Sequence, residues 1–314
     1  MPIATKRKVE EKKSAPIIEA EPAPQPLQEE QAAAPKVTAL IFSYDSAPAL
    51  RRCISALEGS YDRSTIEILV VDCGSHDESP QVDTEFVGVT ILRLPRYFGR
   101  TKALNIGTRT ASGEHLFFLT PNVEVLPTTI PALMARLESD PEAVAVCPLL
   151  LDTQAHPIAQ FHLLPTPATG LNIPPVVIDK SADAISVEHA SFQAFLVRKY
   201  FVKGINYLDE RYGEFGCEQE LCFQIRRASR KTLALPQVTA LYTPGSPYSD
   251  ASRTIFQADR IHGTAVYFAK HYGLLTGVLF RVKAVLKSLF TLRWGLFSSL
   301  ISVTKIDGSQ SDIL

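Results

Sequence analysis

The sequence predicts a doubly wound α/β domain with a largely parallel sheet, and three observations support this fold class. Short β-rich apolar runs alternate with segments of helical spacing over residues 37–151. The runs are apolar throughout, which is typical of strands that are covered on both faces. Polar residues directly follow several of the runs, at the sheet edge where such folds bind their ligands.

The expected elements can be given in chain order. Strands are expected at VTALIFSY (37–44), IEILVVD (66–72), VTILRLP (89–95), EHLFFLT (114–120) and AVAVCPLLL (143–151). Helices are expected at 46–59, 100–111 and 127–141, and a turn with a helix start follows residue 72. Ser46 is the expected N-cap of the first helix, because Pro48 lies in its first turn and apolar residues follow at helical spacing.

The composition restricts the class of protein. With 46% hydrophobic and 21% charged residues, the chain is ordinary for a folded protein, and its formal net charge of -1 does not favour a nucleic-acid partner. The five cysteines include no CxxC pair, so we expect neither a disulfide framework nor structural zinc, and a reducing cytoplasmic environment. The first thirty residues contain no apolar segment of the kind found in signal peptides.

Four parts are expected along the chain. Residues 1–35 carry the charge run KRKVEEKK and are rich in Pro, Glu, Gln and Ala, which predicts a disordered tail. Residues 36–270 form the folded domain, 271–305 a basic amphipathic segment, and 306–314 a second tail.

The C-terminal segment is apolar but interrupted by cations. It has no run of about 18 uncharged residues, so a membrane-spanning helix is not expected. One helical stripe consists of Leu274, Val278, Val282, Val285 and Leu289, and the cations Arg281, Lys283 and Lys287 fall on the other side. This pattern favours a helix in the plane of an anionic membrane surface, with Trp294 as an interfacial anchor. A helix that closes the core of the domain is the alternative.

Polar residues at three strand ends mark a candidate site. They are Tyr44, Asp45, Asp72 and the corner 120–122. A lone Asp72 would ordinarily cap its own turn, but three strand ends together favour a ligand site. Neither GxGxxG nor GxxxxGK[ST] occurs, so no motif supports a dinucleotide-binding or P-loop fold.

Four stretches carry a resemblance to a known family. They are ALIFSYDSAPALRRCISAL, IEILVVDCGSHDES, YFGRTKALNIGTRTASGEHLFFLTPNVEV and NYLDERYGEFGCEQELCFQIRRA. In their order and spacing the chain resembles family 2 glycosyltransferases over residues 37–245, and the rhamnosyltransferase-like branch most of all. The resemblance implies a GT-A fold, a nucleotide-sugar donor and inversion at the anomeric carbon.

The resemblance also implies donor-binding roles for particular residues. Tyr44 and Asp45 match positions that line the nucleoside base, and Asp72 matches the carboxylate that hydrogen-bonds the base or ribose. Asp77 matches a residue that steadies the same loop.

Two more donor-binding candidates lie on the helix expected at 100–111. Lys102 is expected to face the pyrophosphate, with a solvated position as the alternative. Asn105 is expected beside the donor site, although with Gly107 it could instead serve close packing of the helix.

The sequence departs from the family at the metal corner. Where the family has an aspartate that binds Mg²⁺ or Mn²⁺, this chain has Asn122, and a second ligand, a histidine, is replaced by Tyr242. A neutral amide oxygen is a weak ligand for a hard cation, and a phenol with a pKa near 10 is poor. We therefore expect no protein metal ligands here, although Mg or Mn remains a possible cofactor, and Asn122 is expected to keep the corner's shape.

The catalytic base is also altered. The family's Glu-Asp pair is Cys217-Glu218 here, so Glu218 is the expected general base, with its carboxylate one methylene further out. A helix-start carboxylate favoured by the helix dipole is the alternative for this residue. Glu220 should point elsewhere on the helix, and Phe192, in place of a small residue, would either narrow the sugar pocket or join the core.

Together these observations predict a glycosyltransferase. It would move a sugar from a nucleotide-sugar to a carbohydrate or lipid-linked, membrane-associated acceptor in polysaccharide or glycolipid assembly, at the inner face of the cell membrane. Without metal ligands, the leaving group would need Lys102, Arg100 or Arg96. The alternative is a non-catalytic member of the fold that acts as a binding or partner module.

Overall fold

The computed structural model describes residues 1, 35–245, 252–302 and 305–309. The expected N-terminal tail lies outside this part except at its ends, as does most of the expected C-terminal tail. None of the helices in the described ranges is long and apolar enough to cross a membrane.

Within the described part, nine strands form one sheet in the order β3-β2-β1-β4-β10-β6-β11-β5, with β8 paired to β11. Their bounds are β1 Val37–Ser43, β2 Ile66–Asp72, β3 Val89–Arg93, β4 His115–Leu119, β5 Val123–Val125, β6 Ala143–Leu151, β8 Ile185–Val187, β10 Ala194–Arg198 and β11 Lys231–Tyr242. A separate pair consists of β7 (Phe161–His162) and β9 (His189–Ala190).

The direction of the strands changes across the sheet. Strands β1 to β4 pair in parallel, as predicted, and β6 is parallel to β11. Strand β10 lies antiparallel between β4 and β6, and β5 and β8 are antiparallel to β11. The sheet is therefore mixed. Its parallel half contains four of the five strands expected from the sequence, and the fifth, β6, lies beyond the antiparallel β10.

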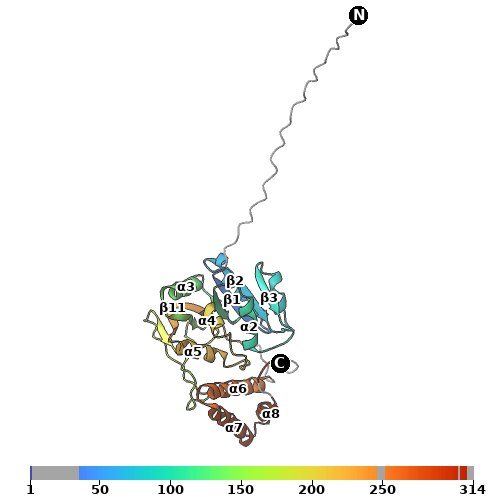
Figure 1. Cartoon of the computed structure of the whole chain (residues 1–314), viewed down its shortest axis with the longest axis vertical. Coiled ribbons are helices and arrows are strands. Elements are labelled where there is room, and N and C mark those ends of the chain that lie inside the picture. The colour runs from blue at the N-terminus through green and yellow to red at the C-terminus, as the bar shows by residue number, and fades with distance from the viewer. Residues whose placement is uncertain (2–34, 246–251, 303–304, 310–314) are drawn as a thin grey trace. The chain divides into compact units, whose positions relative to one another are not determined.

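Helices flank this sheet (Figure 1). Their bounds are α1 Ala47–Glu58, α2 Arg100–Thr110, α3 Thr129–Ser139, α4 Lys199–Gly204, α5 Cys217–Arg227, α6 Arg253–His271, α7 Leu274–Phe290 and α8 Trp294–Ser302, with short 3-10 turns at Arg63–Thr65 and Ser79–Thr84. Helices α6, α7 and α8 pack against one another.

Two apolar cores, one on each face of the sheet, explain why the strands are apolar throughout. Leu40 and Phe42 of β1 point into the core that contains residues of α2, α5 and α6. Ala39 and Ile41 point into the opposite core, with residues of α1 and α3. Burying a Leu, Ile or Phe side chain stabilises the fold by about 1.5–3 kcal/mol. Strands that are apolar on both faces therefore favour a core on each side of the sheet.

Ser46 is the N-cap residue of α1, as predicted, but a distant loop and not its own side chain caps the helix. The Ser46 side chain makes no cap bond, and its Oγ lies 2.9 Å from Ser43 Oγ. Instead Asp77 Oδ2 accepts a hydrogen bond of 2.8 Å from the backbone N–H of Ala47. The loop after β2 is therefore tied to the start of α1, in keeping with the expected steadying role of Asp77.

A buried aspartate on α6 connects three parts of the chain. Asp259 Oδ2 accepts from the backbone N–H groups of Glu214 and Phe215 at 2.9 and 3.0 Å, and Oδ1 accepts from that of Ile306 at 2.7 Å. This carboxylate therefore holds the loop before α5 and a C-terminal segment together.

We predict that Asp259→Asn lowers the free energy of unfolding by about 1–3 kcal/mol, because one set of N–H donors would face an amide NH₂. Urea denaturation measures this change. Asp183→Asn, at a carboxylate whose side chain is 87% exposed, is the matched control and should change little. Equal stability of both variants would show that Asp259 does not hold these segments.

Candidate functional site

A cavity of about 280 Å³ contains residues from the carboxyl ends of β1 and β4, where the sequence predicts a site. Of the predicted residues, Tyr44, Asn122 and Glu218 line it, together with Arg100 and Tyr242. These residues come from five separate segments of the chain. The sheet and the loop before α5 thus bring together side chains that are up to about two hundred positions apart.

Tyr44 lies at the buried side of this cavity. Its side chain is 5% exposed, and its ring contacts that of Tyr97 edge-on, with centroids 4.8 Å apart. Burial, followed by the charge of Asp45, raises the pKa of its phenol, so it is neutral at pH 7. Its ring can form an aromatic wall for a ligand.

The carboxylates of Asp45 and Asp72 hold the loop after β2. Asp72 is buried, and its oxygens accept from Ser75 Oγ at 2.5 Å and from Ser75 N at 3.2 Å. Burial raises the pKa of Asp72. Asp45 has φ +39 and accepts from His76 N at 2.6 Å.

Neither Asp45 nor Asp72 is among the described residues that line the cavity. The contacts of Asp72 are those of a residue that caps its own turn, which is the alternative that the sequence left open. Contact of either carboxylate with a nucleoside stays a prediction.

The structure places Lys102 and Asn105 away from this cavity. Lys102 is exposed, with Nζ 4.3 Å from the centroid of the Phe98 ring. Asn105 is buried, and its amide donates to Leu208 O at 2.8 Å and to Glu210 Oε1 at 2.9 Å. Neither side chain therefore lies where the sequence predicts a donor-binding residue. Helix α2 directs Lys102 toward Phe98 and Asn105 toward Leu208.

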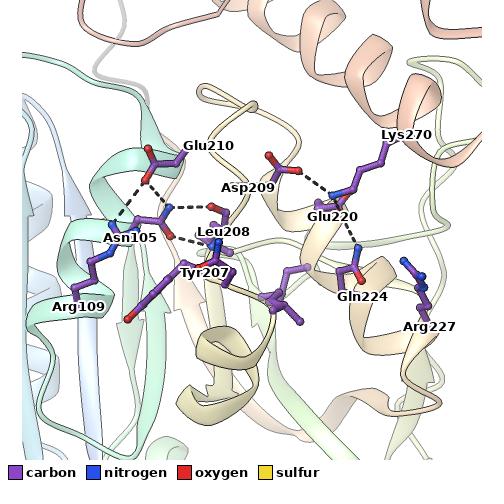
Figure 2. A pocket seen from close by; sticks show the side chains of 14 residues that line it. Asn105, Arg109, Tyr207, Leu208, Asp209, Glu210, Glu220, Gln224, Arg227 and Lys270 are labelled. Atoms are coloured by element: carbon purple, nitrogen blue, oxygen red, sulfur yellow. Dashed lines mark hydrogen bonds and ion pairs between the residues drawn. The ribbon is translucent and has the colours of Figure 1, made fainter. Parts of the chain in front are cut away.

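Asn105 borders a different cavity, of about 640 Å³, which Figure 2 shows. On its other side Lys270 Nζ donates to Asp209 Oδ2 at 2.8 Å and to Glu220 Oε1 at 2.7 Å (Figure 2). Glu220 also accepts from Tyr212 and contacts His271. The expectation that Glu220 points away from Glu218 is confirmed, and its contacts are those of a structural network.

Hydrogen bonds and strand pairing hold the corner at Asn122. Pairing of β5 with β11 sets Tyr242 opposite Val123, so Asn122 and Tyr242 border the same cavity. Asn122 Nδ2 donates to Gly245 O at 3.0 Å, and its backbone carbonyl accepts from Thr243 N at 3.0 Å. The amide thus stabilises the turn by hydrogen bonds that need no charge.

These residues do not fit a divalent metal ion. An amide and a phenol offer no anionic oxygen, and hard cations such as Mg²⁺ and Mn²⁺ favour carboxylates. Among the residues that the structure describes, no group of three or more His, Cys, Asp or Glu could hold a metal. The five cysteines are buried and free.

Glu218 is held at the start of α5. The N-cap Gly216 has φ +111, and a Cβ there would collide with the ring of Tyr212, so the sharp entry to the helix requires glycine. Glu218 Oε2 accepts from Phe192 N at 3.1 Å and lies 3.8 Å from Arg100 Nη1. Its carboxylate is therefore held in a fixed orientation, as general-base work requires.

Arg100 is the cation that the structure brings to the cavity. Its Nη2 lies 3.0 Å from Oε1 of the buried Glu214, whose Oε2 accepts from Tyr97 Oη at 2.6 Å. The other expected cations, Arg96 and Lys102, both lie against Phe98.

Phe192 belongs to the core. Its side chain is 2% exposed and contacts Phe118 and Phe195, with ring centroids 4.9 and 5.0 Å away. The ring therefore does not narrow the cavity, while its backbone N–H orients Glu218.

A second cavity, of about 210 Å³, adjoins the first, and Glu218 and Ser191 line both. The second cavity includes His162, His189 and Gln219. No motif or spacing in the sequence marks these three residues, because β7, β9 and α5 meet only in the folded chain.

Comparison with known proteins identifies the family and the fold. The profile of the family described as "Glycosyl transferase family 2" matches residues 38–203. The TPR repeat-containing protein Synpcc7942_0270 of Synechococcus elongatus is 29% identical over 132 residues, which are 42% of this chain and 31% of that protein. The match thus spans less than a third of that relative.

Three solved structures share this fold at low sequence identity. GalNAc-T7 with UDP, GalNAc and Mn²⁺ has a TM-score of 0.56 and 16% identity, over 74% of this chain and 52% of that one. The mannosyltransferase PcManGT of Pyrobaculum calidifontis, with GDP-Man and Mn²⁺, has a TM-score of 0.54 and 15% identity, over 85% of each chain. Residues 1–349 of TarS of S. aureus, with UDP, have a TM-score of 0.53 and 14% identity, over 74% of this chain and 65% of that one.

We predict that binding of UDP or GDP to this chain is insensitive to EDTA, because Asn122 and Tyr242 replace a carboxylate and an imidazole. Asn122→Asp with Tyr242→His should make binding at least about tenfold tighter with Mn²⁺ than without it, and either change alone should do less. Calorimetric titration measures this. Asn172→Asp with Tyr200→His, at exposed positions, is the matched control. A large loss of affinity for the unmodified protein in EDTA would show that other residues supply a metal site.

Proposed function

Because this chain belongs to glycosyl transferase family 2, we propose that it transfers a sugar from a nucleotide-sugar donor to an acceptor hydroxyl. The donor is bound in the cavity of Tyr44, Asn122 and Arg100. The carrying observation is Glu218, whose oriented carboxylate faces this cavity and the adjoining one. The GalNAc-T7 structure is a complex with UDP and the PcManGT structure one with GDP-Man, which supports a donor of this class.

The reaction is a single displacement with inversion. Glu218 accepts the proton of the acceptor hydroxyl as its oxygen attacks the anomeric carbon of the donor sugar. The bond from that carbon to the diphosphate oxygen breaks, and its electron pair leaves with the nucleoside diphosphate. The hydrogen bond from Phe192 N fixes the direction of the carboxylate, since one oxygen is held while the other is available.

Arg100 stabilises the charge that develops on the diphosphate. A guanidinium matches phosphate oxygens with several parallel N–H donors and stays protonated throughout. Its position is fixed by the buried carboxylate of Glu214, so little rearrangement is needed as charge builds up. No step of this reaction uses a metal ion.

A second candidate function is suggested by the same corner. Asn122 and Tyr242 lack the charge that the family uses at this place, and Glu218 is already close to Arg100. These features also suit a protein that binds a nucleotide-sugar without turnover and acts as a binding module. The two functions differ in whether product forms.

We predict that Glu218→Gln lowers the rate of sugar transfer by about 10²–10⁴-fold, because the amide cannot take the proton. Affinity for the nucleoside diphosphate should change little. Chromatography of products from a panel of nucleotide-sugars and acceptors measures the rate. Glu78→Gln, at an exposed carboxylate, is the matched control.

Two results would contradict the assignment. Full activity of Glu218→Gln would remove this residue as the base. If the unmodified chain binds nucleotides but transfers no sugar from any donor in the panel, the binding-module function is the correct one.

We further propose that the acceptor is membrane-associated and that the chain works as a peripheral protein at the cytoplasmic face, in polysaccharide or glycolipid assembly. The support is the exposed apolar face of α7. It consists of Leu274, Leu275, Val278, Leu279, Val282, Leu286 and Phe290, each between 47% and 80% exposed. Trp294, at the start of α8, is 59% exposed. Such an apolar face is typical of helices that lie in the membrane interface.

The charges around this face suit an anionic surface. Lys283 and Lys287 are exposed on α7, and no acidic residue occurs in residues 274–302. Arg281 differs from the expectation, because it donates to His262 Nδ1 at 2.9 Å and to Leu300 O at 3.1 Å, between α6 and α8.

The opposite face of α7 packs against the protein. Gly277 is buried, and a Cβ there would collide with Ala265 and Ala269 of α6. One face of α7 therefore closes the core of the domain, as in the alternative expected from the sequence. We propose that the other face lies on the membrane.

We predict that the full chain sediments with vesicles that contain anionic lipid and is released by high salt. Lys283→Glu with Lys287→Glu should weaken this binding at least about tenfold, because each basic residue contributes about 1 kcal/mol at such a surface. Lys180→Glu with Lys203→Glu, an equal charge change at other exposed positions, is the control. Equal loss in both variants, or sedimentation with neutral vesicles alone, would contradict the proposal.

A further inference from the structure

The second cavity contains buried polar atoms that the protein leaves unsatisfied. His189 is 4% exposed, and neither of its ring nitrogens has a hydrogen-bond partner in the described structure. The same holds for His162 Nδ1 and Gln219 Oε1 in the described part of the chain. All three residues line this cavity. Buried polar groups normally find partners in the fold, so several orphans around one cavity indicate a ligand that supplies them.

These groups are electrically neutral. Burial lowers the pKa of His189 to about 4 and also lowers that of His162, so both imidazoles are uncharged at neutral pH. Their ring centroids are 5.8 Å apart. A neutral imidazole offers one donor and one acceptor, and the Gln219 amide offers both kinds of group as well. A ligand hydroxyl, which also donates and accepts, is the natural complement.

Apolar side chains and one arginine form much of the rest of the cavity wall. Its walls include the apolar side chains of Leu171, Ile173 and Phe215, which suit the C–H face of a sugar ring. Arg260 is an exposed residue whose Nη2 contacts Leu171 O at 3.4 Å. The volume of about 210 Å³ is below the range of about 300–1,000 Å³ that is common for drug-sized ligands, so one ring fits better than a chain.

We propose that the second cavity binds the acceptor through a single neutral sugar residue, with His189 and Gln219 as the residues that select its hydroxyls. The assignment rests on the proposed function, because it takes Glu218 as the base that both cavities share. One hydroxyl of this sugar gives its proton to Glu218, and its oxygen forms the new bond to the anomeric carbon as the diphosphate leaves. His162 lies beside His189 and takes part in the same hydrogen-bonding set.

The test uses the full chain with saturating UDP or GDP and a panel of methyl glycosides of neutral hexoses and 6-deoxyhexoses. Ligand-observed NMR measures glycoside binding, and thermal denaturation measures stability. His189→Leu should weaken glycoside binding at least tenfold while the melting temperature stays equal or rises, because two unpartnered polar atoms are removed. Nucleotide affinity should not change.

Two further variants sharpen this test. Gln219→Leu should reduce affinity most for those glycosides whose binding depends on one particular hydroxyl, and deoxy glycosides identify that hydroxyl. His156→Leu, at an exposed histidine outside the cavity, is the matched control and should alter neither binding nor stability.

Several outcomes would overturn the assignment. If nucleoside diphosphate binds but no glycoside does, or if His189→Leu binds glycosides as well as the unmodified protein, the acceptor assignment fails and the proposed function stands. Preferential binding of glycerol 3-phosphate over every glycoside would also overturn it. If no nucleoside diphosphate binds, the proposed function fails and the acceptor assignment fails with it.

Discussion

The buried carboxylate of Glu214 is the group on which the geometry of the site depends. It accepts hydrogen bonds from Tyr97 Oη and Arg100 N and pairs with the Arg100 guanidinium at 3.0 Å, while its own N–H donates to Asp259 on α6. Segments more than a hundred residues apart are thereby fixed around the start of α5. Breaking such a buried pair typically costs about 3–5 kcal/mol, so Arg100 and Glu218 are held facing one cavity.

The two cavities that Glu218 lines differ in the polar groups that they present, although each also includes one arginine, Arg100 in the first and Arg260 in the second. The first contains the Arg100 guanidinium, which suits a leaving diphosphate, and the second presents the neutral groups of His162, His189 and Gln219. We propose that this difference separates the roles of the two cavities, with the donor in the first and the acceptor in the second. Asn122 has a structural role in the first cavity, because its amide stabilises the turn by donating to Gly245 O. Without a metal ion at this corner, Arg100 supplies the positive charge of the cavity.

The sequence predicted the parallel half of the sheet and its helices because continuous apolar runs and helical spacing are local signals. It also predicted that Asn122, Tyr242 and Glu218 share one site, because the order of the family's motifs fixes which segments meet there. It did not predict the antiparallel β10 or the three-residue β5, whose pairing depends on distant strands. The surroundings of Lys102 and Asn105 could not be predicted either, since tertiary contacts determine where α2 turns each side chain.

We propose that Glu218 activates an acceptor hydroxyl for direct attack on the donor sugar, with Arg100 in place of a metal. Proton NMR of the first-formed product, in a reaction that contains EDTA, tests this most directly through the configuration of the anomeric carbon. We expect transfer with inversion of the configuration found in the nucleotide-sugar. Retention of configuration, or transfer that stops completely in EDTA and returns with Mn²⁺, would contradict it.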